Sequence, residues 1–134
     1  MKVDRLKASI LANAEEICRL NARIHETVRV RFRSVEEGCE WQRACQEFHS
    51  RYDELAFPGG YADALQRIAA GEPDAVEAAL CFLEVRQYFF RSGYMFKDIL
   101  RKAKRAPLSK PQSDRLASIV AAYEQYHVQR SREA

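Results

Sequence analysis

The sequence predicts an all-α fold, an antiparallel bundle of five or six helices that forms a single helical domain over residues 1–134. Apolar residues recur every three or four positions over long stretches, which is the spacing of one helix face. Only five glycines and four prolines occur, so there is little turn material for a many-stranded sheet. Hydrophobic residues make up 47% of the chain, enough for a core. The length fits one domain.

The first helix is expected to run from Val3 to Phe32, with no proline or glycine to interrupt it. A helix of that length is roughly 45 Å long, which exceeds the diameter of a compact domain of this size. It must therefore kink, fray or project, and we expect fraying at its start and a bend near Asn13 or Asn21. Its inward face follows one apolar series: Val3, Leu6, Ile10, Ala14, Ile17, Leu20, Ile24 and Val28.

The second helix opens with a capping box, Ser34 followed by Glu37, in which each side chain satisfies a backbone N–H at the helix start. An apolar stripe follows, and the segment from Phe57 to Gly60 ends the helix. The short join to the first helix predicts an antiparallel hairpin, with Trp41 and Phe48 packed against the first helix.

Glycine and proline residues mark the ends of the next helices. A short third helix, residues 61–70, should stop at Gly71, because glycine readily takes the left-handed conformation past a helix end. Pro73 suits the first turn of a fourth helix. That helix is expected to continue through the aromatic cluster Tyr88-Phe89-Phe90 to a break at Ser92-Gly93.

The last two predicted helices follow that break. A fifth segment should run from Tyr94 to about Lys104. A second capping box, Ser109 with Gln112, opens the final helix. Its expected inward residues are Leu116, Ile119, Val120 and Tyr123.

Charge is distributed unevenly along the chain. Residues 1–33 carry eight Lys or Arg against four Asp or Glu, residues 34–84 carry three against eleven, and residues 85–134 carry eleven against four. The net charge of +3 therefore conceals basic ends and an acidic middle. Such polarity indicates charged binding partners rather than a particular fold.

The sharpest local feature is a basic stripe in the fifth segment. At 100° per residue its cations share an arc of about 100°, opposite an apolar face. The stripe is either a solvated face, whose cations also interact favourably with the negative C-terminal end of the helix dipole, or a surface that binds an anionic partner. The stripe residues are Lys97, Arg101, Lys104 and Arg105.

Two features disfavour nucleic acid as that partner. The pI of 8.7 is lower than is usual for a nucleic-acid-binding domain. The second helix carries acidic residues, Glu36, Glu40 and Glu47 among them, which would repel phosphate unless turned away. Aromatic residues between positions 88 and 96 would suit base stacking, but at helical spacing we expect them in the core.

Four cysteines, Cys18, Cys39, Cys45 and Cys81, include no C-x-x-C pair, and no secretory segment is recognised before them. We expect reduced, mostly buried thiols in a cytoplasmic protein. The longest apolar run, residues 78–83, is too short to cross a bilayer, so no membrane association is predicted.

Catalytic and metal signals are weak. Cys45 and His49 share a helix face but lack a second ligand pair for zinc, and nothing near them supplies an oxyanion site. Glu124 and His127 match one Glu-x-x-His element where di-iron bundles need two. Glycine-rich phosphate loops are absent. An anion-binding helix start over residues 91–94 is possible, but a hinge is the simpler interpretation.

The sequence therefore predicts no catalytic residue, no metal and no cofactor. We expect a non-enzymatic protein–protein interaction module, either an adaptor or an immunity-type protein that neutralises a toxin domain. Its binding residues would come from the basic stripe, from Glu36, Glu40 and Glu47, or from both. The alternative is a nucleic-acid-binding protein that uses the stripe of residues 97–105.

Overall fold

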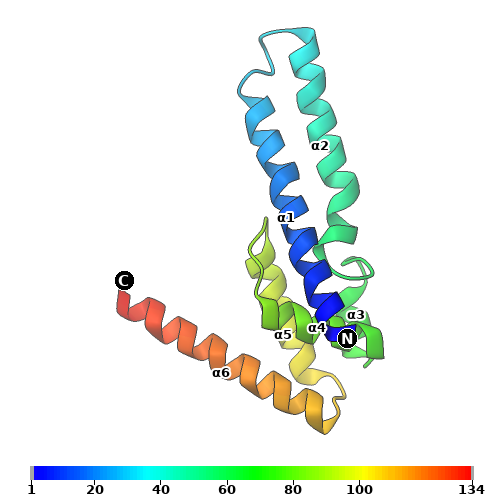
Figure 1. Ribbon diagram of the computed structural model, residues 1–134, viewed down its shortest axis with the longest axis vertical. Helices are drawn as coiled ribbons and strands as arrows, with labels where there is room; N and C mark the ends of the chain where they lie inside the picture. The colour runs from blue at the N-terminus through cyan, green and yellow to red at the C-terminus, as the bar shows by residue number, and fades with distance from the viewer. Residues whose placement is uncertain (1, 134) are drawn as a thin grey trace.

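The computed structural model describes residues 2–133 and confirms the all-α fold: these residues form six helices and no strand (Figure 1). The helices are α1 (Lys2–Val28), α2 (Val35–Ala56), α3 (Ala64–Ala69), α4 (Pro73–Val85), α5 (Ser92–Arg105) and α6 (Lys110–Glu133).

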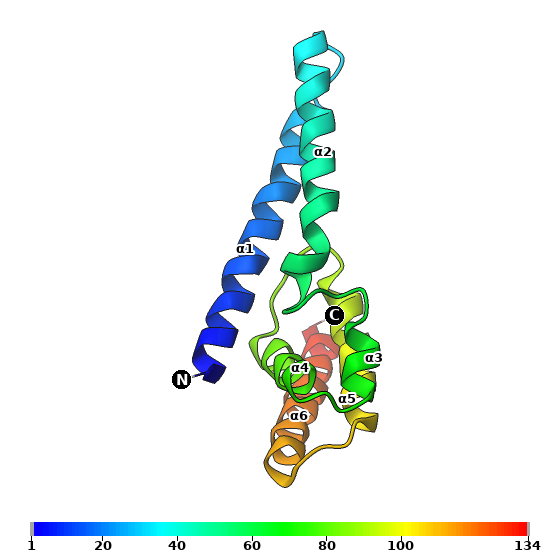
Figure 2. The same cartoon turned by 90° about the vertical axis from the view of Figure 1, so that its right-hand side faces the viewer.

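The antiparallel hairpin of α1 and α2 dominates the shape of the molecule. Its turn end projects away from α3–α6 in both views (Figures 1 and 2). Helix α1 runs without interruption through Asn13 and Asn21, so the expected bend is wrong, and the helix ends at Val28 rather than at Phe32. The long α1 projects beyond the other helices. This is stable because the antiparallel α2 packs along the apolar face of α1.

The predicted capping box of α6 forms in full, whereas that of α2 forms in part, because the Glu37 carboxylate accepts from the Ser34 hydroxyl and not from the Ser34 N–H. The backbone N–H of Glu37 donates to Ser34 Oγ at 3.1 Å at the start of α2. Ser109 and Gln112 exchange reciprocal bonds at the start of α6, of 3.0 and 3.3 Å. Each cap satisfies backbone donors that a helix start leaves without an internal partner, so α2 and α6 begin where the sequence predicts.

Helix α4 lies at the centre of the core. Eight of its thirteen residues are buried, from Ala75 to Leu83 with the exception of Glu77. An all-round apolar helix must be covered on every side, and α1, α3, α5 and α6 all contact α4. Phe57, at the end of α2, is fully buried and contacts Phe82 with ring centroids 5.9 Å apart.

An ion-pair cluster fastens α6 to this core. Arg115 Nη1 lies 2.7 Å from Glu77 Oε1, and its Nη2 lies 2.6 Å from Glu84 Oε1. Lys7 of α1 reaches the same Glu84 oxygen at 3.4 Å. Leu116 and Ile119, next on α6, are buried as predicted. Three helices therefore meet at Glu84.

The fourth helix ends earlier than expected. It stops at Val85, where Arg86 takes a left-handed conformation with φ 54°, and a loop over residues 86–91 follows. Helix α5 then begins at Ser92, so Ser92-Gly93 is a helix start rather than a break within a helix. Three consecutive aromatic residues would span about 200° of a helix surface, more than one buried face can cover.

Candidate functional site

The basic stripe lies on the exposed side of α5, as predicted. Lys97, Arg101, Lys104 and Arg105 are all exposed, whereas Met95, Phe96, Ile99, Leu100 and Ala103 of the same helix are buried. Arg101 pairs with Asp98 at 3.5 Å, and the exposed fractions of the two side chains are 63% and 43%. Within residues 2–132 the other three stripe cations make no ion pair. Most of the charge of the stripe is therefore not neutralised by the fold.

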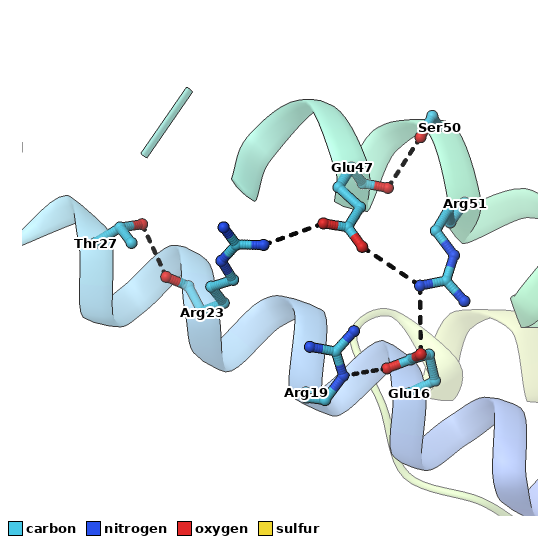
Figure 3. Close-up of polar contacts among 7 residues, drawn as sticks. All are labelled: Glu16, Arg19, Arg23, Thr27, Glu47, Ser50 and Arg51. Atoms are coloured by element: carbon cyan, nitrogen blue, oxygen red, sulfur yellow. Dashed lines mark hydrogen bonds and ion pairs between the residues drawn. The ribbon is translucent and has the colours of Figure 1, made fainter. Parts of the chain in front are cut away.

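The three predicted acidic binding residues lie apart from that stripe. Glu36 and Glu40 are exposed on α2 near the turn end of the hairpin and make no ion pair within the described part of the chain. Glu47 differs, because its carboxylate lies between Arg23 of α1, at 3.1 Å, and Arg51, at 3.5 Å (Figure 3). The fold therefore gives Glu47 a role inside the hairpin.

Glu16 continues the same network on α1. It accepts hydrogen bonds from Arg19 and, at 3.3 Å, from Arg51 (Figure 3). The hydrogen bond from Arg19, aided by the charges of both arginines, holds the pKa of the Glu16 carboxyl below its usual value. Surface pairs such as these contribute little individually, but here they link α1 to α2 in a network.

Three aromatic residues expected in the core are exposed instead. The exposed fraction is 90% for Tyr88 and 73% for Tyr94, and Phe90 is also exposed, whereas Phe89 and Phe96 are buried as predicted. The loop over residues 86–91 turns Phe89 inward and Tyr88 and Phe90 outward, whereas Tyr94 and Phe96 lie on opposite sides of α5. The run of three aromatics in the sequence was the signal that not all of them fit one buried face.

The 86–91 loop is fixed by specific hydrogen bonds. Tyr52 of α2 donates its hydroxyl to the carbonyl of Phe90 at 2.6 Å, and the N–H of Phe89 donates to Ser92 Oγ at 3.0 Å. Burial raises the pKa of Tyr52, although the nearby Arg91 opposes that effect, so the hydroxyl keeps its proton and remains a donor. The exposed rings of Tyr88 and Phe90 therefore lie on a loop whose backbone is fixed by hydrogen bonds.

A cavity of about 750 Å³ connects these rings to the stripe. It lies between α1, the 86–91 loop and the start of α5, and its lining includes Tyr88, Phe90, Arg91, Tyr94 and Lys97 but no carboxylate. On α5, Tyr94 also shares the arc of Lys97, Arg101 and Arg105, at helical spacings of three and four residues. We call the basic stripe together with Tyr88, Phe90, Arg91 and Tyr94 the basic–aromatic face.

The cysteines are less buried than predicted. All four are free, but only Cys81 is buried, whereas Cys18 and Cys39 are exposed. Burial raises the pKa of the Cys81 thiol, although the Arg115 guanidinium 3.7 Å from its Sγ works against that shift. A raised pKa disfavours the thiolate, the form that reacts as a nucleophile.

Metal ligands do not gather in the described residues: no group of three or more His, Cys, Asp or Glu side chains there is arranged to hold a metal ion. His49 is exposed on α2, and its ring lies edge-on to Phe48 with centroids 5.9 Å apart. Glu124 and His127 are exposed on the second half of α6.

No family model, no curated protein and no solved structure matches this chain. Among the described residues, every helix is too short or too polar to cross a lipid bilayer.

Proposed function

We propose that this protein is a small non-enzymatic interaction module whose basic–aromatic face binds an acidic surface of a partner protein. The observation that carries the proposal is the continuity of that face. Exposed Tyr94 lies on the same side of α5 as Lys97, Arg101 and Arg105, and in the described part of the chain only Asp98 pairs with any of these cations.

The residue types of this face are those of protein interfaces. Tyrosine and arginine are enriched among residues that dominate binding energy, because they combine a large contact area with hydrogen-bonding ends. Lysines at the edge of such a face, here Lys97 and Lys104, accelerate association with an acidic partner by long-range attraction. The held 86–91 loop lowers the entropy cost of binding, since its backbone is already ordered.

The acidic residues of α2 support a partner outside the chain. Glu36 and Glu40 lie in the first two turns of α2, which starts at the turn end of the hairpin (Figure 1), and they form no ion pair with a stripe cation. They form a separate acidic patch that a basic surface would recognise. An adaptor or an immunity-type protein in the cytoplasm fits this arrangement and remains the class that we propose.

Single-stranded nucleic acid is the second candidate partner, and one observation favours it. Tyr88, Phe90 and Tyr94 are exposed beside Arg91 and Lys97, and flat rings next to cations form a stacking platform for bases. The pI of 8.7 and the acidic residues of α2 still argue against a strong, general attraction to phosphate.

An affinity pull-down from the native host, followed by mass spectrometry, tests the proposal. The bait is the wild-type protein, compared with the triple variant Arg101→Glu, Lys104→Glu and Arg105→Glu. The matched control, Arg5→Glu, Arg43→Glu and Arg132→Glu, changes net charge equally at exposed cations elsewhere. We expect an acidic protein that the wild type and the control retain and the triple variant loses.

A gel shift with single-stranded RNA and DNA separates the two candidates. Nucleic-acid binding weakens steeply as salt rises, because each phosphate contact releases a counterion. A salt-sensitive shift that the triple variant abolishes, without any protein captured in the pull-down, would replace the first candidate with the second. Equal recovery of every captured protein by all three baits would rule out the basic stripe as the binding surface.

A further inference from the structure

A second cavity, of about 450 Å³, lies on the other side of Tyr88, between the 86–91 loop, the start of α5 and the second half of α6. Its size falls within the range of small-molecule sites. The cations that line it are Arg86, Lys97 and Arg130, with His127 beside them, and no carboxylate is among the lining residues.

Arg86 is the central feature of this cavity. Its guanidinium carbon lies 4.5 Å from the ring centroid of Tyr126, 5.3 Å from that of Phe96 and 5.7 Å from that of Tyr123. Such stacking positions the planar group but leaves its N–H donors at the edge. Within residues 2–132 the Arg86 side chain makes no hydrogen bond and no ion pair, although it is partly buried. A fork of unused donors fits an anion with two acceptor oxygens.

The backbone of Arg86 is strained to hold this position. Its φ of 54° belongs to the left-handed region, which a side chain larger than glycine occupies at some cost. The guanidinium is therefore directed onto the rings by the end of α4 rather than by a carboxylate partner.

The walls of the cavity are aromatic. Tyr123 lies 5.1 Å from Phe96 and 4.5 Å from His127, measured between ring centroids. Arg130 Nη1 donates to the Tyr126 hydroxyl at 3.1 Å, which keeps a second guanidinium at the rim. Flat rings beside arginine suit a ligand that has its own flat ring, because such rings stack.

The floor of the cavity adds backbone donors to these cations. Ser92 and Gly93 line it in the first turn of α5, where N–H groups have no partner within the helix. The Ser92 N–H donates to the Phe89 carbonyl at 2.9 Å, so the Gly93 N–H is the donor of this pair that an anion can use. Gly93 faces open space, since an added Cβ would meet no atom within 4 Å. An anion can thus approach the α5 start next to Arg86, Lys97 and Arg130.

We propose that this cavity binds a nucleotide, with its phosphate held by Arg86, Arg130 and the start of α5 and its base stacked among the tyrosines. Only a ligand that joins an anion to a flat ring uses both the unpaired cations and the aromatic walls. The site shares only Lys97 with the basic stripe, and it shares Tyr88 and Lys97 with the whole basic–aromatic face.

Titration calorimetry with adenosine monophosphate tests the proposal, with adenosine and inorganic phosphate as half-ligand probes. We expect the monophosphate to bind at least ~10-fold more tightly than either half, and to shift the backbone amide signals of Ser92 and Gly93 in NMR spectra. Arg86→Lys keeps the charge but removes the fork, and Arg130→Gln removes the rim cation. Each should weaken binding at least ~10-fold, whereas Arg132→Gln, which does not line the cavity, should not.

A 5′-phosphorylated tetranucleotide distinguishes the source of the nucleotide. Binding of the tetranucleotide alone, lost in Arg86→Lys, would assign the site to the end of a strand, and binding of the monophosphate would assign it to a free nucleotide. Either result supports the proposal. Absence of binding by both, or binding that neither variant weakens or that inorganic phosphate matches, would overturn it. Unchanged binding in the triple stripe variant would keep this result independent of the partner-binding test.

Discussion

Phe48 joins the hairpin to the rest of the molecule. Its exposed fraction is 6%, and its ring contacts Tyr52 and Phe90 with centroids 5.4 and 5.7 Å apart. The apolar stripe of α2 predicted this burial. The same stripe predicted that Trp41 packs in the core, but Trp41 lies near the turn and is only partly buried. The guanidinium carbon of Arg31 is 5.5 Å from the centroid of its ring.

Replacing Phe48 with alanine should lower the free energy of unfolding by about 3–5 kcal/mol, because it leaves an aromatic cavity in the core. Denaturant unfolding measures the change. The matched control is Phe32→Ala, at a ring that is 87% exposed at the turn, where we expect a change within about 0.5 kcal/mol. Similar midpoints for the two variants would show that Phe48 does not pack as described.

Glu84 connects stability to pH. Its burial works to raise its pKa, but the hydrogen bonds and charge of Arg115, with help from Lys7, outweigh burial and hold the pKa below its usual 4.5. A carboxyl with a lowered folded-state pKa stabilises the fold above its unfolded value. That contribution is lost as the pH falls through the folded-state pKa.

Glu84→Gln should therefore cost about 1.5–3 kcal/mol at pH 7, the usual contribution of hydrogen bonds to a charged group. It should also reduce the loss of stability between pH 5 and pH 3, roughly the range that brackets the ordinary pKa of a glutamate. Unfolding curves across that range provide the measurement. Glu40→Gln, at an exposed carboxylate without an ion pair, should retain the wild-type pH dependence. Parallel curves for all three proteins would contradict the role of Glu84.

At the scale of elements, helix ends were predictable where a local signal sets them. Ser34 and Ser109 cap their helices, and Gly71 follows α3 with φ 78°, as their residue types indicate. The end of α4 was not predictable in this way. Arg86 carries no intrinsic preference for the left-handed conformation, and its position depends on rings contributed by α5 and α6.

Gly71 also sets how closely α3 approaches the α5–α6 connection. A Cβ built there would lie 2.5 Å from Pro107 Cγ, and the left-handed backbone disfavours any side chain. Gly71→Ala should therefore cost more than about 2 kcal/mol. Gly93→Ala is the control, since it adds a methyl in open space within a helix and should be neutral or slightly stabilising. Equal melting temperatures for the two variants would show that this contact does not constrain the fold.

The whole molecule shows what sequence periodicity leaves open. Spacing predicted which face of each helix is apolar, but it left open whether the long first helix kinks, frays or projects, and the hairpin projects beyond the other helices (Figure 2). The basic stripe was predictable because it lies on one helix. The extension of this stripe by Tyr88 and Phe90 was not predictable, because it depends on a loop in a segment that the sequence predicts to be helical. Neither set of residues identifies its ligand, since charge and aromaticity suit several anionic partners.

The basic and acidic residues of the chain are separated in the fold. The basic stripe and the acidic pair Glu36 and Glu40 lie on different elements and make no ion pair with each other. Like charges clustered on α5 repel one another unless an anionic group relieves them, and among residues 2–132 only Asp98 pairs with a stripe cation. We therefore expect relief from a binding partner.

The affinity of the triple variant Arg101→Glu, Lys104→Glu and Arg105→Glu for the partner recovered by pull-down, measured at low and high salt, tests this account most directly. The variant should keep the wild-type unfolding midpoint, because the stripe lies opposite the apolar face. It should bind at least about tenfold more weakly at low salt, mainly through slower association, and lose much of the salt dependence. Unchanged affinity at low salt in an equally stable variant would show that the stripe is only a solvated face.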